Sequence, residues 1–501
     1  MPTVPLPNEP NLEQLRIQAK ELRDSVRAGE PRALALVAEH HPNGRPDDAA
    51  RAKFSLSSAQ LVIARRYRFT SWPRLKKHLD VIAQFMRAPG KIGPIDNPID
   101  EFLRISGLNY ADDGPGRWAE ARRLLHEHPE IPERSMHAAA AANDVEQVRR
   151  HLRADPTLAR VEGGPFAWPP LLYLTYSRVN PDVAAEAAIE CTRLLLNAGA
   201  DPNAGYLWLG MPSAFTALTG VFGEGELGPQ LQPRHPNSLA LARVLLEAGA
   251  DANDNQTIYN RMFAPDSDHL ELLFEYGLGQ GDGGPWKHRL GDALDSPVKM
   301  VRGQLQWAVT HAMVERTQLL IDHGVDIVSP FDNGQTPSTA AALSGHAAIV
   351  ALLVANGASA PEVDTPDELI AAAMANNRAA LERIRAEHPD ALAVARERRP
   401  GLVVWAAAQA PNAVALLVEL GFDVNAFGRS DVPIEQPWET ALHGAACGNI
   451  DLVRELLALG ADPTIRDKQF DSTPLGFARY CEQTDIVELL APLTTDVPSP
   501  P

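Results

Sequence analysis

The chain has 501 residues and a formal net charge of −18. Its three cysteines, Cys191, Cys447 and Cys481, show no CxxC spacing, so the sequence predicts neither a disulfide scaffold nor a zinc knuckle. The opening MPTVPLPNEP lacks a secretory pattern, and no apolar run reaches the ~18 residues of a membrane helix. We therefore expect a soluble cytoplasmic protein in a reducing setting, with no membrane partner.

The first ninety residues differ from the rest in charge. They contain 15 Lys and Arg against 9 Asp and Glu, a balance of +6, whereas residues 91–501 contain 31 against 55, a balance of −24. Because an acidic surface repels phosphate backbones, we do not expect residues 91–501 to bind nucleic acid.

Residues 1–90 show helix–turn–helix periodicity and are predicted to form a basic helical cap domain. The run RRYRFTSWPRLKK (65–77) places six basic residues around Phe69 and Trp72. We favour a solvated face with both aromatic side chains packed inward. The alternative is a contact with nucleic acid or another anionic surface through Arg65, Arg66, Arg68 and Lys76.

The stretch APGKIGPIDNPID (88–100) is a short connector rich in Pro and Gly. The segments on either side of it carry opposite charge and therefore attract each other. We expect the cap domain to dock on the following residues, with apolar contacts from Phe69, Trp72 and Leu75 supplying most of the hold because exposed charges are screened by salt.

From residue 91 to residue 493, a Leu-rich helical phrase ending in Gly returns several times. The copies are LLLNAGADPN (194–203), LLEAGADAN (245–253), LLIDHGVDI (319–327), LLVANGAS (352–359), LLVELGFDV (416–424) and LLALGADPT (456–464). Glycine after a helix takes a left-handed turn at low cost. Other copies, such as LLHEHPE (124–130) and IRAEHPDA (384–391), end at a proline, which stops the helix. Such self-similarity predicts an array of stacked helix pairs.

Three stretches show the repeated unit most fully: GQTPSTAAALSGHAAIVALLVANGAS (334–359), ETALHGAACGNIDLVRELLALGADP (439–463) and STPLGFARYCEQTDIVELL (472–490). In these residues the chain resembles the ankyrin-repeat family, in a bacterial-type form with a helical N-terminal cap. The resemblance implies an all-α fold, an ankyrin-like α-solenoid of stacked helix pairs. We expect the array to span 91–493, with loop insertions at 204–236 and 279–300 and a disordered tail at 494–501. The resemblance also implies that His443 and His137 hold neighbouring loops in register.

Several short patterns look like cofactor or metal motifs, but their neighbouring residues do not fit such sites. Residues 279–284 match GxGxxG, but they follow the helix HLELLFEYG where a dinucleotide site needs a strand. The loop that begins at Asp251 lacks the glycine and the final glutamate of a calcium loop. His126 and His128 are separated only by Glu127 at a helix end. We expect no cofactor and no metal.

The loops between units carry aromatic residues suited to anchoring a partner. The resemblance implies that such loops line a concave groove, and that Asp332, Asn333 and Gln335 occupy its variable loop positions. We therefore predict a protein partner bound at Trp168, Trp208, Trp286 and Trp438, together with those three loop residues. The alternative for the aromatic residues is that they cover the flanks of their own units.

A second function class stays open. The two insertions could form a pocket for catalysis or for a small ligand, with His235, Lys287, His288 and Asp292 as the polar groups. Convergent polar side chains with perturbed pKa values would favour this enzyme or ligand-binding function. An open groove lined by loop tips would favour partner binding.

Overall fold

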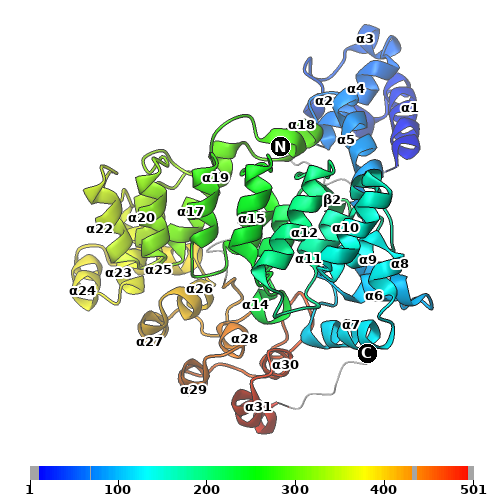
Figure 1. The fold of residues 1–501 in the computed structure, drawn as a ribbon. Coiled ribbons are helices and arrows are strands. Elements are labelled where there is room, and N and C mark those ends of the chain that lie inside the picture. The colour runs from blue at the N-terminus through cyan, green and yellow to red at the C-terminus, as the bar shows by residue number, and fades with distance from the viewer. Residues whose placement is uncertain (1–10, 68, 431–436, 495–501) are drawn as a thin grey trace. The chain divides into compact units, whose positions relative to one another are not determined.

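The computed structural model describes residues 11–67, 69–430 and 437–494, and these are mostly helical (Figure 1). The prediction of an all-α protein is confirmed. The chain divides into two compact units, Met1–Met300 and Val301–Pro501, which are described separately. Within the described ranges, no helix is long and apolar enough to cross a membrane. The predicted tail lies, apart from Thr494, outside the described residues.

The first unit begins with α1 (Leu12–Ala28), α2 (Pro31–His40), α3 (Asp48–Ala52), α4 (Leu56–Arg66) and α5 (Trp72–Phe85). All of these helices except α3 contribute buried side chains to one core. Ser71 caps α5 by accepting the Arg74 N–H, and Pro73 suits the first turn. Phe69 and Trp72 pack inward against the buried side chains of α1–α5, as predicted. A separate domain at 1–90 stays a prediction, and Arg68 lies outside the described residues.

A small sheet joins the end of α5 to the first insertion. Its strands are β1 (Met86–Arg87), β2 (Gly205–Trp208) and β3 (Ala214–Thr216), in the order β1-β2-β3. β1 pairs parallel with β2, placing Met86 opposite Leu207, and β2 pairs antiparallel with β3. The insertion at 204–236 therefore supplies two strands that bind the chain segment following α5.

Apolar contacts between α5 and the insertions involve different residues from those predicted. Val81, Ile82 and Phe85 form a cluster with side chains of both insertions, which are Leu207, Ala214, Trp286, Leu290 and Leu294. The prediction for Phe69, Trp72 and Leu75 is wrong, because these side chains belong to the core of α1–α5. Opposite charges do meet here, since Arg74 forms an ion pair with Asp292.

The remaining elements of the first unit form helix pairs. They are η1 (Pro89–Lys91), α6 (Pro98–Ile105), α7 (Pro115–Glu127), α8 (Ile131–Arg134), α9 (Met136–Ala141), α10 (Val145–Ala154), η2 (Pro156–Arg160), α11 (Pro170–Tyr176), α12 (Ala185–Asn197), α13 (Ala217–Phe222), α14 (Gly228–Leu231), α15 (Ser238–Glu247), α16 (Asn255–Arg261), α17 (Asp268–Glu275), α18 (Gly284–Leu290) and η3 (Gly291–Ala293). Two rows run through them. One row packs in the order α9, α11, α13, α16. The other packs in the order α10, α12, α15, α17 (Figure 1).

The second unit begins within α19 and repeats the same arrangement. Its elements are α19 (Pro297–Thr310), α20 (Val314–Asp322), α21 (Pro337–Leu343), α22 (Ala347–Ala355), α23 (Thr365–Met374), α24 (Arg378–Glu387), α25 (Ala391–Arg398), α26 (Leu402–Gln409), η4 (Pro411–Ala413), α27 (Val414–Glu419), α28 (Ala441–Ala445), α29 (Ile450–Ala458), α30 (Pro474–Tyr480), α31 (Thr484–Leu490) and η5 (Ala491–Leu493). α26 packs on α28 and α28 on α30, while α29 packs on α31. One core runs through this unit from Leu343 to Leu490.

The helix ends follow the two predicted endings. The six glycines that close the repeated phrases, together with Gly277 after α17, all have positive φ, from +73° at Gly324 to +97° at Gly249. They are Gly199, Gly249, Gly277, Gly324, Gly357, Gly421 and Gly460. At the proline endings, α7 stops two residues before Pro129 and α24 two residues before Pro389.

The Asp and Asn that follow these glycines hold one repeat to the next. Asp423 Oδ1 accepts the Asn425 N–H at 2.8 Å and so shapes the turn. The Asn425 side chain then donates to Gly460 O at 3.2 Å and accepts the Asp462 N–H at 2.8 Å. Asn203 makes the equivalent pair of bonds to Gly249 and Asp251. The polar residues of the phrase therefore satisfy backbone groups between repeats.

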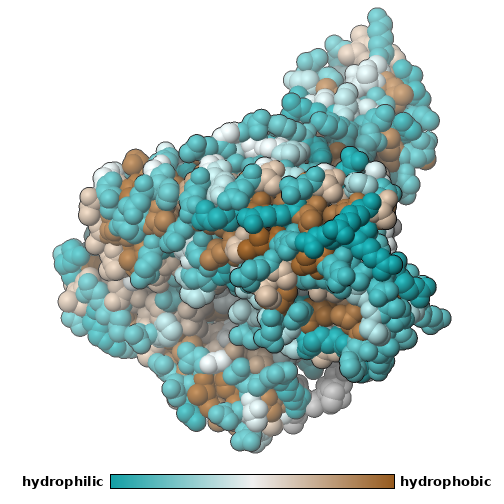
Figure 2. Space-filling model, viewed as in Figure 1, coloured by the Kyte–Doolittle hydropathy of each residue, from teal (hydrophilic) through white to brown (hydrophobic). Residues whose placement is uncertain are grey.

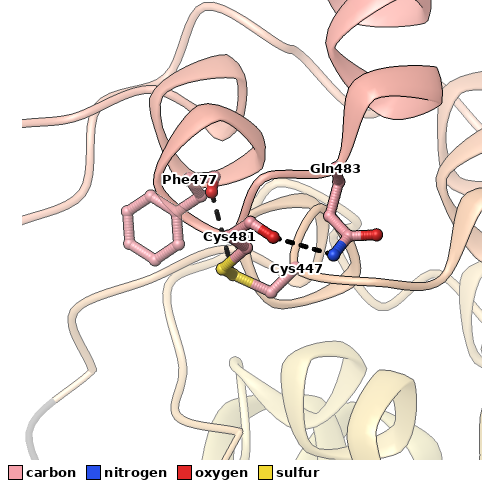
Figure 3. The surroundings of a disulfide bond; sticks show 4 residues. All are labelled: Cys447, Phe477, Cys481 and Gln483. Atoms are coloured by element: carbon pink, nitrogen blue, oxygen red, sulfur yellow. Dashed lines mark hydrogen bonds between the residues drawn. A yellow bond between two sulfur atoms is a disulfide. The ribbon is translucent and has the colours of Figure 1, made fainter. Parts of the chain in front are cut away.

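One cysteine pair corrects the sequence analysis, which expected no disulfide scaffold. Cys447 and Cys481 form a disulfide (Figure 3). The two residues follow α28 and α30, at the same turn in consecutive helix pairs. Their separation of 34 residues matches one repeat, so stacking brings them together. That spacing was the signal in the sequence, although no CxxC motif marks it.

Candidate functional site

His235, the first residue of the alternative ligand site, is part of the core. Its side chain is 2 % exposed, and its Nδ1 accepts the Asn237 N–H at 3.1 Å. Burial, with a smaller effect of the Arg178 charge, lowers the pKa of His235 to about 3. A neutral, enclosed imidazole of this kind holds its loop in place and does not face a ligand.

The other three residues of the alternative site each have a local partner. Lys287 Nζ donates to Gly291 O at 2.9 Å and so ties down the end of α18. His288 Nε2 lies 2.8 Å from a carboxylate oxygen of Asp282, and both side chains are exposed. Asp292 pairs with Arg74 of α5. These polar groups do not converge on one point, so the described residues give no support to catalysis at this place.

Three neighbouring residues have the spacing of a metal site. Ligand atoms of Asp266, Asp268 and His269 lie within 4.8 Å of one another. Two arginines already balance the carboxylates, because Arg234 binds Asp268 at 2.8 Å and Arg261 pairs with Asp266. The ion pairs with the two arginines therefore explain why the two carboxylates lie close together, and we assign this cluster a structural role.

Trp168 lies in an aromatic core and not on a surface. Its indole is 1 % exposed and contacts the rings of Tyr173, Tyr176 and Tyr206 at centroid distances of 4.9–5.3 Å. The loop that carries it folds back on itself, because Gly163 and Trp168 exchange both backbone hydrogen bonds. Its position matches the alternative that such aromatic residues cover their own unit.

Trp208 and Trp286 lie beside the small sheet. The half-buried Trp208 donates its Nε1–H to Asn109 O at 3.0 Å, and the 7 % exposed Trp286 donates to Asn203 O at the same distance. Trp286 forms one wall of a cavity of about 190 Å³, with Phe85, Arg160 and Arg289 among the other walls. Arg289 covers the Trp286 ring at 4.6 Å. Both indoles therefore join the insertions to the rest of the first unit.

Trp438 of the second unit has a different setting. It is half-buried, and its ring contacts Phe470 at 5.7 Å and Phe477 at 6.1 Å between centroids. Phe470 is 64 % exposed. Figure 2 shows a mostly polar face with apolar patches, and a contiguous apolar patch, unlike a single exposed residue, is a feature of interaction sites. We name Trp438, Phe470 and Phe477 the aromatic cluster.

An ordered loop holds Phe470 in the exposed position. The buried Asp467 carboxylate accepts the backbone N–H groups of Gln469, Phe470 and Ser472 at 2.8, 2.6 and 2.8 Å. Lys468 N–H donates to Trp438 O at 2.8 Å, so this loop is fixed to the preceding one. The exposed ring is therefore attached to a backbone with little freedom to move.

The comparisons with known proteins point to the same repeats. A family model described as ankyrin repeat matches residues 438–468, which include Trp438 and end at Lys468. A relative, Ankyrin repeat protein nuc-2 of Neurospora crassa, is 23 % identical over 265 residues, or 51 % of this chain. The chain therefore contains an ankyrin repeat at residues 438–468 and resembles an ankyrin-repeat protein over about half of its length. The matched region covers 23 % of the relative, so the chain corresponds to less than a quarter of that protein.

Asp332, Asn333 and Gln335 lie together in one loop of the second unit. They form the tip of a tight loop before α21, in which Phe331 N–H donates to Gln335 O at 2.8 Å. Asp332 and Asn333 are exposed, and Gln335 is half-buried. Counted back from the Thr-Pro that opens the next helix, Asn333 and Phe470 occupy the same loop position. The loop of Asn333 precedes α21, whereas the aromatic cluster lies on the loops before α28 and α30 and on α30 itself.

The two histidines predicted to hold neighbouring loops in register do so. His443 Nε2 lies 3.1 Å from Ser472 O, and its Nδ1 lies 2.7 Å from the Thr440 hydroxyl. His137 Nε2 lies 2.9 Å from Val161 O. Sequence analysis missed Phe470 and Phe477, although the position that Phe470 shares with Asn333 was a signal that could have identified it.

Proposed function

We propose that this ankyrin-repeat protein is a protein–protein interaction module whose aromatic cluster binds an apolar segment of a protein partner. Ankyrin repeats generally mediate protein–protein interaction. The single observation that carries the proposal is the exposed ring of Phe470 on a loop fixed by the Asp467 carboxylate. We further propose that the helix pairs within each unit stack as an α-solenoid, which would present successive loops along one side.

The physical argument rests on pre-organisation. An aromatic ring buries a large apolar area when a partner covers it, and the hydrophobic free energy scales with that area. The Phe470 backbone is already held by hydrogen bonds, so binding would order few additional groups. Trp438 and Phe477 supply the neighbouring apolar surface. A rigid aromatic residue amid such a surface has the features of a binding hot spot.

The two other functions have less support. The polar groups proposed for catalysis lie apart and are each paired, as described above. Among the basic residues proposed for nucleic acid, Arg65 already donates to His40 O at 3.4 Å. Partner binding needs neither a convergent polar set nor a basic face. Location in the cytoplasm also stays a prediction.

Selection from a displayed peptide library on the full-length protein tests the proposal. Peptides that bind the wild type should bind Phe470→Ser and Trp438→Ala at least about tenfold more weakly, because each change removes an anchor. Val298→Ser is the matched control, since Val298 is 62 % exposed and lies outside the cluster. Equal binding by all variants would overturn the assignment, as would a selection that yields no peptide.

A further inference from the structure

We propose that the Cys447–Cys481 disulfide is a redox latch that keeps the last described repeat in the form that binds a partner. The inference rests on the proposed function of the aromatic cluster. The inference concerns how binding at that site is regulated. Oxidation of the two cysteines would favour partner binding, and reduction would weaken it.

The latch joins two repeats at the end opposite to their loops. Cys447 lies in the turn between α28 and α29, and Cys481 lies in the turn between α30 and α31. Their Cα atoms are 5.3 Å apart, within the range that a disulfide spans without backbone movement. Figure 3 shows the pair next to Phe477 of the aromatic cluster and Gln483, whose side chain donates to Cys481 O at 2.8 Å.

Solvent can reach this pair. Cys447 is exposed and Cys481 is half-buried, so a small thiol or disulfide reagent can attack. The third cysteine differs, because Cys191 is buried and free, and burial raises the pKa of its thiol to about 12. Redox chemistry at moderate pH should therefore affect the exposed pair and leave Cys191 unchanged.

The last described repeat depends on its contacts for stability. α30 and α31 have seven residues each, too few to hold a helix without tertiary packing. α30 packs on α28, and α31 packs on α29. At the loop end, His443 contacts Ser472 O at 3.1 Å and Lys468 N–H donates to Trp438 O at 2.8 Å. The disulfide supplies the covalent link at the turn end.

Opening the latch would act on the aromatic cluster through α30. Phe477 lies on α30, and Phe470 lies in the loop that leads into it. Local opening of α30 and α31 would separate both rings from Trp438, which belongs to the preceding repeat. The three rings would then no longer form one apolar surface. A smaller fraction of the reduced protein is therefore in the form that binds a partner.

The chemistry is thiol–disulfide exchange with a low-molecular-weight disulfide, RSSR. The Cys447 thiolate attacks RSSR, forming a mixed disulfide and releasing one RS⁻. The Cys481 thiolate then attacks the Cys447 sulfur, forming the protein disulfide and releasing a second RS⁻. Two protons from the protein thiols convert both leaving groups to RSH. Two cysteine sulfurs are oxidised and RSSR is reduced by two electrons; excess RSH reverses the reaction.

Hydrogen exchange on the full-length protein tests the latch without a partner. After treatment with oxidised or reduced glutathione, we expect amides of α30 and α31 to exchange about ten- to a hundredfold faster in the reduced form. Cys447→Ser/Cys481→Ser should exchange fast in both buffers, whereas Cys191→Ser should respond like the wild type. Unchanged exchange on reduction, or three titratable thiols in oxidised, denatured protein, would overturn the proposal.

A second measurement reports on the cluster itself. Fluorine NMR of protein labelled with 5-fluorotryptophan, assigned for Trp438 with the Trp438→Phe variant, should show that resonance shifting on reduction in the wild type. The serine double variant should show one position in both buffers. If these shifts occur but selected peptides ignore Phe470→Ser, the latch stands and the binding function fails. A Trp438 resonance that is insensitive to reduction would contradict the latch.

Discussion

Burial divides the aromatic residues of this protein into those that stabilise it and those available to a partner. Trp405, 1 % exposed, and Trp168 lie in cores, whereas Phe470 is 64 % exposed. Both Trp168 and Phe470 come from loops, so position in a loop does not decide the role. The hydrogen bonds of the two loops differ, because the Trp168 loop closes on itself whereas the Phe470 loop is held by the Asp467 carboxylate.

The buried His235 predicts a loss of stability in acid. The pKa of His235 is about 3 in the folded chain and should be ordinary when unfolded, so unfolding takes up a proton below about pH 6.5. The contribution of His235 to the free energy of unfolding should be fully present above that pH. It should fall by about 2 kcal/mol between pH 7 and pH 5. Urea unfolding followed by circular dichroism measures it.

His235→Gln should flatten that part of the pH profile, because it removes the buried imidazole. An equal slope in His235→Gln and in the wild type would show that another group carries the acid sensitivity.

The sequence does not show which side chains face solvent, and this limited the prediction of the site. Trp438 was named and belongs to the aromatic cluster, but Phe470 and Phe477 were not. The same residue type appeared at Trp168, where the chain folds inward. Repeat patterns fix the position of a loop, while local hydrogen bonds such as those of Asp467 fix which side chain faces solvent. Those bonds cannot be read from spacing alone.

At the scale of the helix pair, the closing glycine and the polar residues after it act together. The glycine permits the left-handed turn, the Asp shapes the next residues, and the Asn bonds to the following repeat. These roles follow from local chemistry, so the helices and their ends could be predicted from sequence. The β1–β2 pairing joins residues far apart in the chain, and no local pattern indicated it.

A pair of glycine substitutions separates turn strain from helix propensity. Gly249 has φ +97° with open space around its Cβ position, so Gly249→Ala should destabilise the protein by about 1–2 kcal/mol through backbone strain alone. Gly303 is exposed within α19, so Gly303→Ala should stabilise it by up to about 1 kcal/mol. Thermal unfolding measures both. The same sign for the two changes would contradict the assigned turn.

At the scale of the whole molecule, the first ninety residues are built into the first unit. β1 pairs with β2, and Ile82 and Phe85 pack with Trp286 and Leu290 of the second insertion. The expected attraction between basic and acidic segments contributes Arg74–Asp292, an exposed pair of small energetic value. That apolar contact supplies most of the association stays a prediction, and the side chains that make this contact are not the ones predicted.

Removing residues 1–90 should therefore lower the melting temperature and promote aggregation. The deletion leaves the β2 edge unpaired and uncovers apolar side chains such as Leu207 and Leu290. Differential scanning calorimetry and light scattering measure the two effects. A truncated protein with unchanged melting and no aggregation would show that these contacts do not stabilise the first unit.

The central claim is that an exposed ring on an ankyrin-repeat loop binds the partner. Titration calorimetry of a selected peptide against the wild type and Phe470→Ser, with a thermal melt of each protein, tests it most directly. We predict that Kd rises by about tenfold or more while the melting temperature stays unchanged, because the ring is exposed and its removal leaves no cavity. An unchanged Kd, or a weaker affinity accompanied by a lower melting temperature, would contradict the claim.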